Sequence, residues 1–265
     1  MRRAVSRAFV AAALALSAAW LGGCAAPGGG RDIVTASDET DADRRARARF
    51  ELAVAYYQQG QSETALDEVK QAIAARPNFG AAYNLRGLIY GSMGQNELAD
   101  ESFRRAIQID SRDADAMHNY AWFHCQNGSY TQAESWFTRA LAVPQYRGTA
   151  RTLLAQGLCQ ARAQRLADAE RSLTRSYEID ASNTITAYHL ADLLFKRGDI
   201  ERARFYVRRA LGSTGTADAQ TLWLAARIEV KARNRAGADT YGRELRRRFP
   251  QSREAAAYDR GQFDE

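Results

Sequence analysis

The chain has 265 residues, of which 46% are hydrophobic and 26% are charged, with a formal net charge of +6. This composition is typical of a folded globular protein and excludes a disordered or fibrous chain. Three of the arginines fall in a predicted export signal, and without them 34 basic residues face 31 acidic ones, a net charge near +3. So small an excess indicates a solvated surface, and we expect no nucleic-acid partner.

Residues 1–23 have the pattern of a lipoprotein signal peptide. Arg2, Arg3 and Arg7 precede the apolar run from Ala8 to Leu21, which is shorter than the about 20 residues of a membrane span. The run ends in "LGGC", which resembles the lipobox of bacterial lipoproteins. The resemblance implies that Cys24 is acylated and becomes the first residue of the mature chain. The alternative is an ordinary secretory signal with an incidental cysteine.

Residues 24–43 are predicted to be the acylated cysteine and a flexible tether. The segment consists mainly of small residues, is rich in glycine and acidic side chains, and has no periodic pattern of apolar residues. Its root-mean-square end-to-end distance is on the order of 25 Å. Ala25, rather than Asp, follows the cysteine, which by the sorting rule for such lipoproteins implies the outer membrane. We therefore expect a folded body that faces the periplasm and is attached to the membrane through its lipid anchor.

A 34-residue period begins after the tether. Glycine and alanine recur together at Gly60 and Ala65, Gly94 and Ala99, and Gly128 and Ala133. This is the period of the tetratricopeptide repeat, a pair of helices packed through small residues. It predicts an all-α fold, a right-handed superhelical solenoid of about six units.

The predicted units are 46–79, 80–113, 114–149, 150–183, 184–218 and 219–250, and the sixth matches the repeat pattern least well. Residues 251–265 are predicted to form a C-terminal cap or tail, because the end of a solenoid needs a polar cover. Gly60, Gly94, Gly128 and Gly198 should each end a first helix in the left-handed conformation. The fourth unit is two residues out of phase, and the slack falls at 143–148.

No catalytic constellation is visible in the sequence. His118, His124 and His189 have no carboxylate or cysteine at helical ligand spacing. His124 and Cys125 are adjacent, so on a helix they point about 100° apart. We therefore expect no enzyme activity, no metal, no cofactor and no small-molecule substrate.

The two remaining cysteines, Cys125 and Cys159, are predicted to form a disulfide. An even pair in an exported protein favours a bond. The 34-residue separation places both cysteines late in the first helices of the third and fourth units, which are expected to stack side by side.

The first helices of such a solenoid line its concave face and offer a groove to a partner. The exposed residues expected there are Asn84, Leu88, His118, Asn119, Trp122, Leu158, Tyr188, Asp192, Trp223 and Arg227. Aromatic and amide side chains suit an extended or helical peptide from another protein. The alternative is that several of these rings simply pack between units.

A lipobox, a short tether and six such units together resemble the type IV pilus biogenesis lipoproteins of the PilF or PilW family. The most specific segments are "AAYNLRGLIYGSMGQNELADESFRRAIQID" and "AMHNYAWFHCQNGSYTQAESWFTRAL". The resemblance implies a pilotin, which promotes outer-membrane localisation or multimerisation of the PilQ secretin and pilus stability. Members of the PilW type also carry a cysteine pair in units three and four.

The partner implied by this resemblance is a secretin subunit or another pilus-assembly protein. The alternative is a different periplasmic scaffold lipoprotein, which organises peptidoglycan enzymes or outer-membrane protein assembly.

Overall fold

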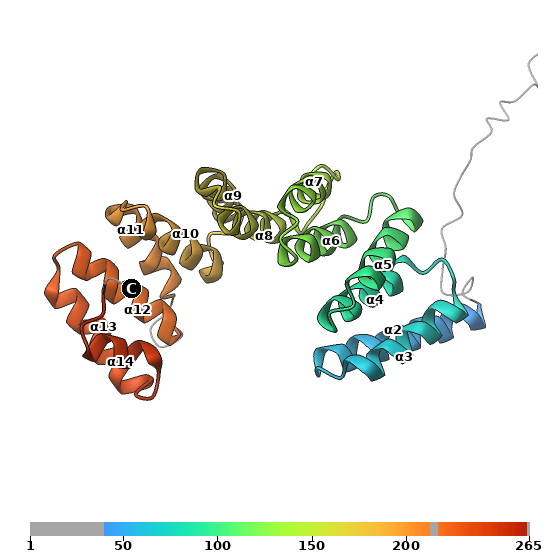
Figure 1. Ribbon diagram of the computed structural model, residues 1–265, viewed down its shortest axis with the longest axis horizontal. Helices are drawn as coiled ribbons and strands as arrows, with labels where there is room; N and C mark the ends of the chain where they lie inside the picture. The colour runs from blue at the N-terminus through green and yellow to red at the C-terminus, as the bar shows by residue number, and fades with distance from the viewer. Residues whose placement is uncertain (1–39, 213–216, 264–265) are drawn as a thin grey trace, which may run out of the picture. The chain divides into compact units, whose positions relative to one another are not determined.

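The computed structural model describes residues 40–212 and 217–263. The predicted signal peptide (1–23), Cys24 and the tether as far as Glu39 lie outside these ranges, so the expectations for them stay predictions. The described residues form thirteen helices and no strand (Figure 1). None of these thirteen helices is long and apolar enough to cross a membrane.

The helices follow one another as six pairs and a short final helix, and each pair is one repeat unit. Their bounds are α2 (Asp41–Gln58) and α3 (Ser62–Ala75), α4 (Gly80–Ser92) and α5 (Asn96–Ile109), α6 (Ala114–Gln126) and α7 (Tyr130–Leu141), α8 (Thr149–Arg162) and α9 (Leu166–Ile179), α10 (Thr184–Lys196) and α11 (Ile200–Ala210), α12 (Ala219–Lys231) and α13 (Arg235–Arg248), and α14 (Arg253–Asp259). The prediction of an all-α tetratricopeptide solenoid is confirmed.

Helix α2 begins earlier than the sequence predicted. It starts at Asp41, inside the predicted tether of residues 24–43. Asp41 and Asp43 lie in its first turn, where negative charge interacts favourably with the positive end of the helix dipole. Ala46, one turn further on, is fully buried. Residues 41–43, which the sequence assigned to the tether, therefore belong to the first helix.

The helices form two layers. The first helices of neighbouring units contact one another along the series α2, α4, α6, α8, α10 and α12. The second helices from α3 to α11 each contact their own first helix and the first helix of the next unit. Side chains also join α9 to α11, where Glu170 pairs with Arg202 and the rings of Tyr177 and Tyr206 pack edge-on. The first helices therefore form a continuous layer, here called the first-helix layer, and the second helices pack against one side of it. In Figure 1, for example, α7 and α9 lie above α6 and α8.

Small residues in the first-helix layer allow large side chains to fill the junctions between units. A Cβ atom on Gly87 would lie 2.8 Å from the ring of Phe103, and one on Gly157 would lie 2.7 Å from Leu173 Cγ. The Phe103 side chain is only 1% exposed, and its ring centroid lies 5.4 Å from that of Tyr120 and 5.6 Å from that of Phe123. The missing side chain at Gly87 therefore leaves room for the Phe103 ring, which joins unit two to unit three.

The turn between the two helices of a unit uses the left-handed conformation. The four predicted glycines adopt it, with φ between 73° and 81° at Gly60, Gly94, Gly128 and Gly198. In units four and six the same place is taken by Gln164, at φ 60°, and by Arg233, at φ 58°. These two residues carry a backbone strain that the four glycines avoid.

Exchanging residues at these turns should change stability in opposite directions. Gly94→Ala is expected to lower the free energy of unfolding by about 1 kcal/mol, because the left-handed backbone disfavours a Cβ atom. Nothing lies within 4 Å of the position of that Cβ atom, so the effect is one of backbone alone. Gln164→Gly should raise the free energy by about 0.5 kcal/mol. Urea unfolding measures both, and shifts of the same sign would contradict the account.

Candidate partner-binding surface

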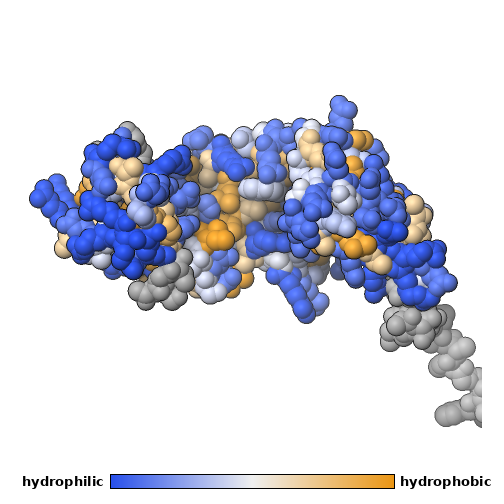
Figure 2. Space-filling model, turned by 90° about the horizontal axis from the view of Figure 1, so that it is seen from below, coloured by the Kyte–Doolittle hydropathy of each residue, from blue (hydrophilic) through white to orange (hydrophobic). Residues whose placement is uncertain are grey.

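The residues predicted for the groove lie on the first-helix layer, and all except His118 are partly exposed. Asn84 and Leu88 come from α4. His118, Asn119 and Trp122 come from α6, and Leu158 comes from α8. Tyr188 and Asp192 come from α10, and Trp223 and Arg227 come from α12. Figure 2 shows apolar residues gathered in a hollow near the middle of one face of the molecule, flanked by hydrophilic residues.

The expectation that His118 is exposed in the groove is wrong. Its side chain is 8% exposed, its Nδ1 atom lies 2.9 Å from Thr152 Oγ1 on α8, and its ring packs edge-on to Phe137. The imidazole therefore belongs to the junction of units three and four. Burial is the main reason that the pKa of His118 is lowered to about 4, and the positive charge of Arg151 lowers it further.

The buried imidazole should make the protein sensitive to mild acid. As the pH falls from about 6.5 to 4, His118 takes up a proton in the unfolded chain but not in the folded one. The unfolded state then binds more protons, so the free energy of unfolding decreases as the pH falls through this window. Urea unfolding between pH 4 and 7 measures the slope, and His118→Gln should make it shallower.

Some slope will remain in that variant, because burial also lowers the pKa of His124 and of His189. A His118→Gln variant with the same slope as the wild-type protein would contradict the assignment.

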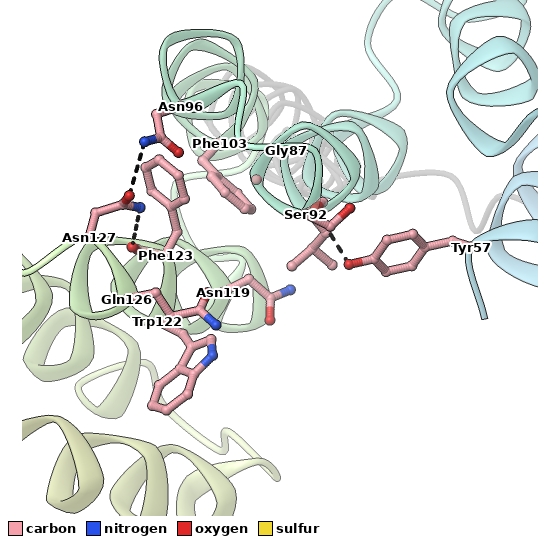
Figure 3. Close-up of a pocket in the computed structure, with 13 residues that line it drawn as sticks. Tyr57, Gly87, Ser92, Asn96, Phe103, Asn119, Trp122, Phe123, Gln126 and Asn127 are labelled. Carbon is pink, nitrogen blue, oxygen red and sulfur yellow. Dashed lines mark hydrogen bonds between the residues drawn. The ribbon is translucent and has the colours of Figure 1, made fainter. Parts of the chain in front are cut away.

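A cavity of about 480 Å³ opens between α2, α4 and α6 (Figure 3). Its walls combine apolar, aromatic and amide side chains with glycine backbone. The lining residues are Tyr57, Gly87, Leu88, Gly91, Ser92, Gly94, Asn96, Phe103, Asn119, Trp122, Phe123, Gln126 and Asn127. Three predicted groove residues, Leu88, Asn119 and Trp122, therefore share one cavity.

Hydrogen bonds fix the amide groups at and beside this cavity. Asn119 Nδ2 donates to Asn84 Oδ1 at 3.1 Å, which ties units two and three together. The Tyr57 hydroxyl donates to the carbonyl oxygen of Leu88 at 3.4 Å. The other amide atoms of the asparagine pair, Asn84 Nδ2 and Asn119 Oδ1, are a donor and an acceptor of the kind that bond to a peptide backbone. Apolar walls with such amides suit an extended peptide segment.

A second cavity, of about 460 Å³, lies over units four and five. Two predicted groove residues line it, Leu158 from α8 and Asp192 from α10. Lys196 Nζ lies 2.6 Å from Asp192 Oδ2. Tyr188 lines a different and smaller hollow, of about 300 Å³, together with Asp218 and Thr221. The structure therefore divides the predicted groove into separate compartments.

At unit six, the chain's own C-terminal tail lies against the predicted groove residues. Arg227 Nε donates to the carbonyl oxygen of Phe263 at 3.1 Å. The ring centroids of Trp223 and Phe263 are 5.4 Å apart. Sequence reasoning missed this contact, although Phe263 is the only aromatic residue after α14.

The structure joins Cys125 of α6 to Cys159 of α8 in a disulfide with a Cα–Cα distance of 5.7 Å. This is the pair that the repeat spacing predicts, and the distance lies in the ordinary range for a disulfide. Both side chains are buried, with Ala121, Phe137 and Ala155 in the same apolar cluster. The bond therefore fixes the stacking of units three and four.

The stacked repeats present an extended surface of the kind that binds other proteins. Within residues 40–212 and 217–263, no group of three or more His, Cys, Asp or Glu side chains is arranged to hold a metal ion. Extended surfaces made of stacked repeats serve to bind other proteins.

Known proteins resemble this chain over most of its length. Profiles described as tetratricopeptide repeat match residues 34–78, 80–113 and 112–182. The type IV pilus assembly protein PilF of Pseudomonas aeruginosa is 27% identical over 244 residues, which cover 92% of this chain and 95% of that protein. An uncharacterised protein of Haemophilus influenzae is 28% identical over 135 residues, 51% of this chain and 75% of that protein.

Two solved structures of similar proteins have the same fold. The crystal structure of PilW, described as a widely conserved type IV pilus biogenesis factor, superposes with a TM-score of 0.72 at 26% identity, covering 80% of this chain and 97% of that one. The structure of Pseudomonas aeruginosa PilF gives a TM-score of 0.73 at 26% identity, covering 84% of this chain and 100% of that one. The chain belongs to the tetratricopeptide repeat family and is homologous, at modest identity, to the type IV pilus biogenesis proteins PilF and PilW.

Proposed function

We propose that the protein is an outer-membrane lipoprotein that acts as a pilotin for type IV pilus biogenesis and promotes localisation or multimerisation of the PilQ secretin. The observation that carries the proposal is the match to PilF, which spans 92% of this chain and 95% of the relative. The likeness therefore extends along nearly the whole chain and not merely over a single repeat. The lipobox-like sequence that ends at Cys24 supports the membrane anchor.

In the proposed mechanism, the protein combines a membrane anchor with a cavity that binds a secretin segment. Acylated Cys24 attaches the protein to the inner leaflet of the outer membrane, and the tether lets the folded body extend from it. The cavity between α2, α4 and α6 then takes an extended segment of a secretin subunit. Leu88 supplies apolar contact area there, and the Asn84–Asn119 pair supplies hydrogen bonds.

The test is a gene deletion with defined complementation. In the bacterium that carries the gene, deletion should reduce multimeric PilQ in outer-membrane fractions, measured by immunoblot, and reduce surface pili. The wild-type gene should restore both, and Cys24→Ser should not. Normal secretin multimers and normal pili in the deletion strain would refute the proposal.

Two matched leucine variants test the cavity. Leu88→Asp places a charge in the cavity of the first-helix layer, whereas Leu98→Asp places one on α5, where the leucine is 41% exposed. Only Leu88→Asp should fail to restore PilQ multimers. Circular dichroism of both purified proteins checks that each is folded. Equal complementation by the two variants would exclude this cavity as the secretin site.

A further inference from the structure

The C-terminal residues Gly261 to Phe263 lie where a partner peptide was expected. Trp223 and Arg227 are one turn apart on α12, in the first-helix layer, at the same places in their helix as Asn84 and Leu88 in α4. In unit six, a main-chain carbonyl and an aromatic ring of the chain itself contact these two residues. The contact has the two components of peptide recognition, a backbone hydrogen bond and a side chain on an aromatic surface.

Three side chains hold Phe263, two at its ring and one at its main-chain carbonyl oxygen. The Trp223 ring lies 5.4 Å from it, the Tyr258 ring lies edge-on at 5.5 Å, and Arg227 binds the carbonyl oxygen of the same residue. Aromatic pairs at such distances contribute about 0.5 to 1.5 kcal/mol beyond the burial of their area. This seat, formed by Trp223, Arg227 and Tyr258, is called the unit-six aromatic seat below.

The seat is also held by contacts that do not involve Phe263. The guanidinium of Arg227 lies 4.9 Å from the centroid of the Phe195 ring on α10. The Tyr258 hydroxyl donates to Asp239 Oδ1 at 3.0 Å, and the Tyr258 ring packs so closely on Gly242 that a Cβ atom there would overlap it. The seat is therefore preorganised, and removing the tail should leave it in place.

The tail turns back toward α12 through local hydrogen bonds, among them one from Arg260 Nε to Gln262 Oε1 at 2.6 Å. Gly261 turns the chain back in the left-handed conformation, at φ 70°, and Gln262 N donates to the carbonyl oxygen of Ala257 at 3.0 Å. Beside the Phe263 and Tyr258 rings an open cavity of about 710 Å³ remains, lined also by Arg233, Arg235 and Asp239. The ring thus occupies its seat without filling the space around it.

The charges around this space indicate the chemistry of the segment that fits. Arg233 and Arg235 line the cavity with one carboxylate, Asp239. In the sequence, Phe263 is followed directly by Asp264 and Glu265. An aromatic residue followed by acidic residues therefore matches an aromatic seat beside a basic cavity.

We propose that the unit-six aromatic seat is a binding site for a protein segment in which an aromatic residue is followed by acidic residues, and that the chain's own tail occupies it as an internal ligand. An external segment must displace Phe263 to bind. Because a short covalent connection gives the tail an effective concentration in the millimolar range, the intact protein binds such a segment more weakly than a protein without the tail.

The test uses the synthetic peptide of residues 257–265, AYDRGQFDE, as a probe. It is titrated by calorimetry into the full chain and into a chain that ends at Arg260. The truncated chain should bind the peptide at least tenfold more tightly than the full chain. A peptide with Phe263→Ala should lose binding to the truncated chain, and Trp223→Ala in the truncated chain should have the same effect.

A second variant guards against misfolding of the truncated chain. Phe263→Ala in the full chain empties the seat but keeps the backbone, and it should also bind the unmodified peptide more tightly than the wild-type chain. The proposal is overturned if neither altered chain binds the peptide, if the alanine peptide binds equally well, or if the full chain binds as tightly as the altered ones. These outcomes do not depend on the identity of the natural partner, so they are separate from the pilotin test.

Discussion

Replacing Cys125 and Cys159 together by alanine is expected to lower the free energy of unfolding by about 3 to 4 kcal/mol. The bond joins residues 34 apart in the sequence, and closing a loop of that length removes this much conformational entropy from the unfolded chain in the chain-entropy model. Alanine avoids placing a hydroxyl in a cluster where the two side chains are 1% and 3% exposed.

Urea unfolding of the wild-type and double-alanine proteins measures this difference. The wild-type protein unfolded in the presence of a reductant is the control, because it loses the bond and keeps both sulfur atoms. Its stability should approach that of the double variant. A double variant within about 1 kcal/mol of the oxidised wild-type protein would contradict a stabilising role for the bond.

Phe103→Ala should be comparably damaging, at about 3 to 5 kcal/mol. The ring is 1% exposed, lies under Gly87 and contacts the rings of Tyr120 and Phe123. Its removal leaves a void at the junction of units two and three that the rigid helix backbones can fill only in part. Because Phe103 also lines the cavity of Figure 3, the variant should weaken partner binding there.

Phe205→Ala is the matched control for this prediction. Phe205 lies on a second helix, α11, and its side chain is 48% exposed, with the Arg209 guanidinium 4.8 Å from the ring centroid. Removing a half-exposed ring leaves no cavity, so the free energy of unfolding should change by less than about 1 kcal/mol. Urea unfolding of the two variants provides the comparison. If the two variants lost the same free energy of unfolding, burial of the Phe103 ring at the junction would not be what stabilises the protein there.

Repetition made much of the fold predictable from sequence. A 34-residue period predicts where each helix pair begins and ends, because every unit packs against its neighbours through the same positions. Pairs two to six begin at Gly80, Ala114, Thr149, Thr184 and Ala219, within one residue of the predicted starts. The left-handed glycines were predictable because few other residues adopt that conformation without strain. Gln164 and Arg233 were not, since their side chains carry no signal for it.

The candidate site was less predictable than the fold. Helical periodicity predicted which side of each first helix faces the groove. It did not predict which residues of neighbouring first helices lie opposite one another. His118 illustrates this, because the longer connection before α8 brings Thr152 opposite its ring and buries it. The cavity between α2, α4 and α6 likewise depends on how three helices from different units approach one another.

The sequence by itself determined the repeat architecture, the positions of the turns and the cysteine pair that is bonded, because each follows from a local pattern repeated at a fixed interval. Only the tertiary structure decided which first-helix residues remain exposed, how the groove is divided into cavities, and that Phe263 lies on Trp223. The physical reason is that these features depend on contacts between residues from different units or from the irregular tail. Such contacts are set by packing, which has no period in the sequence.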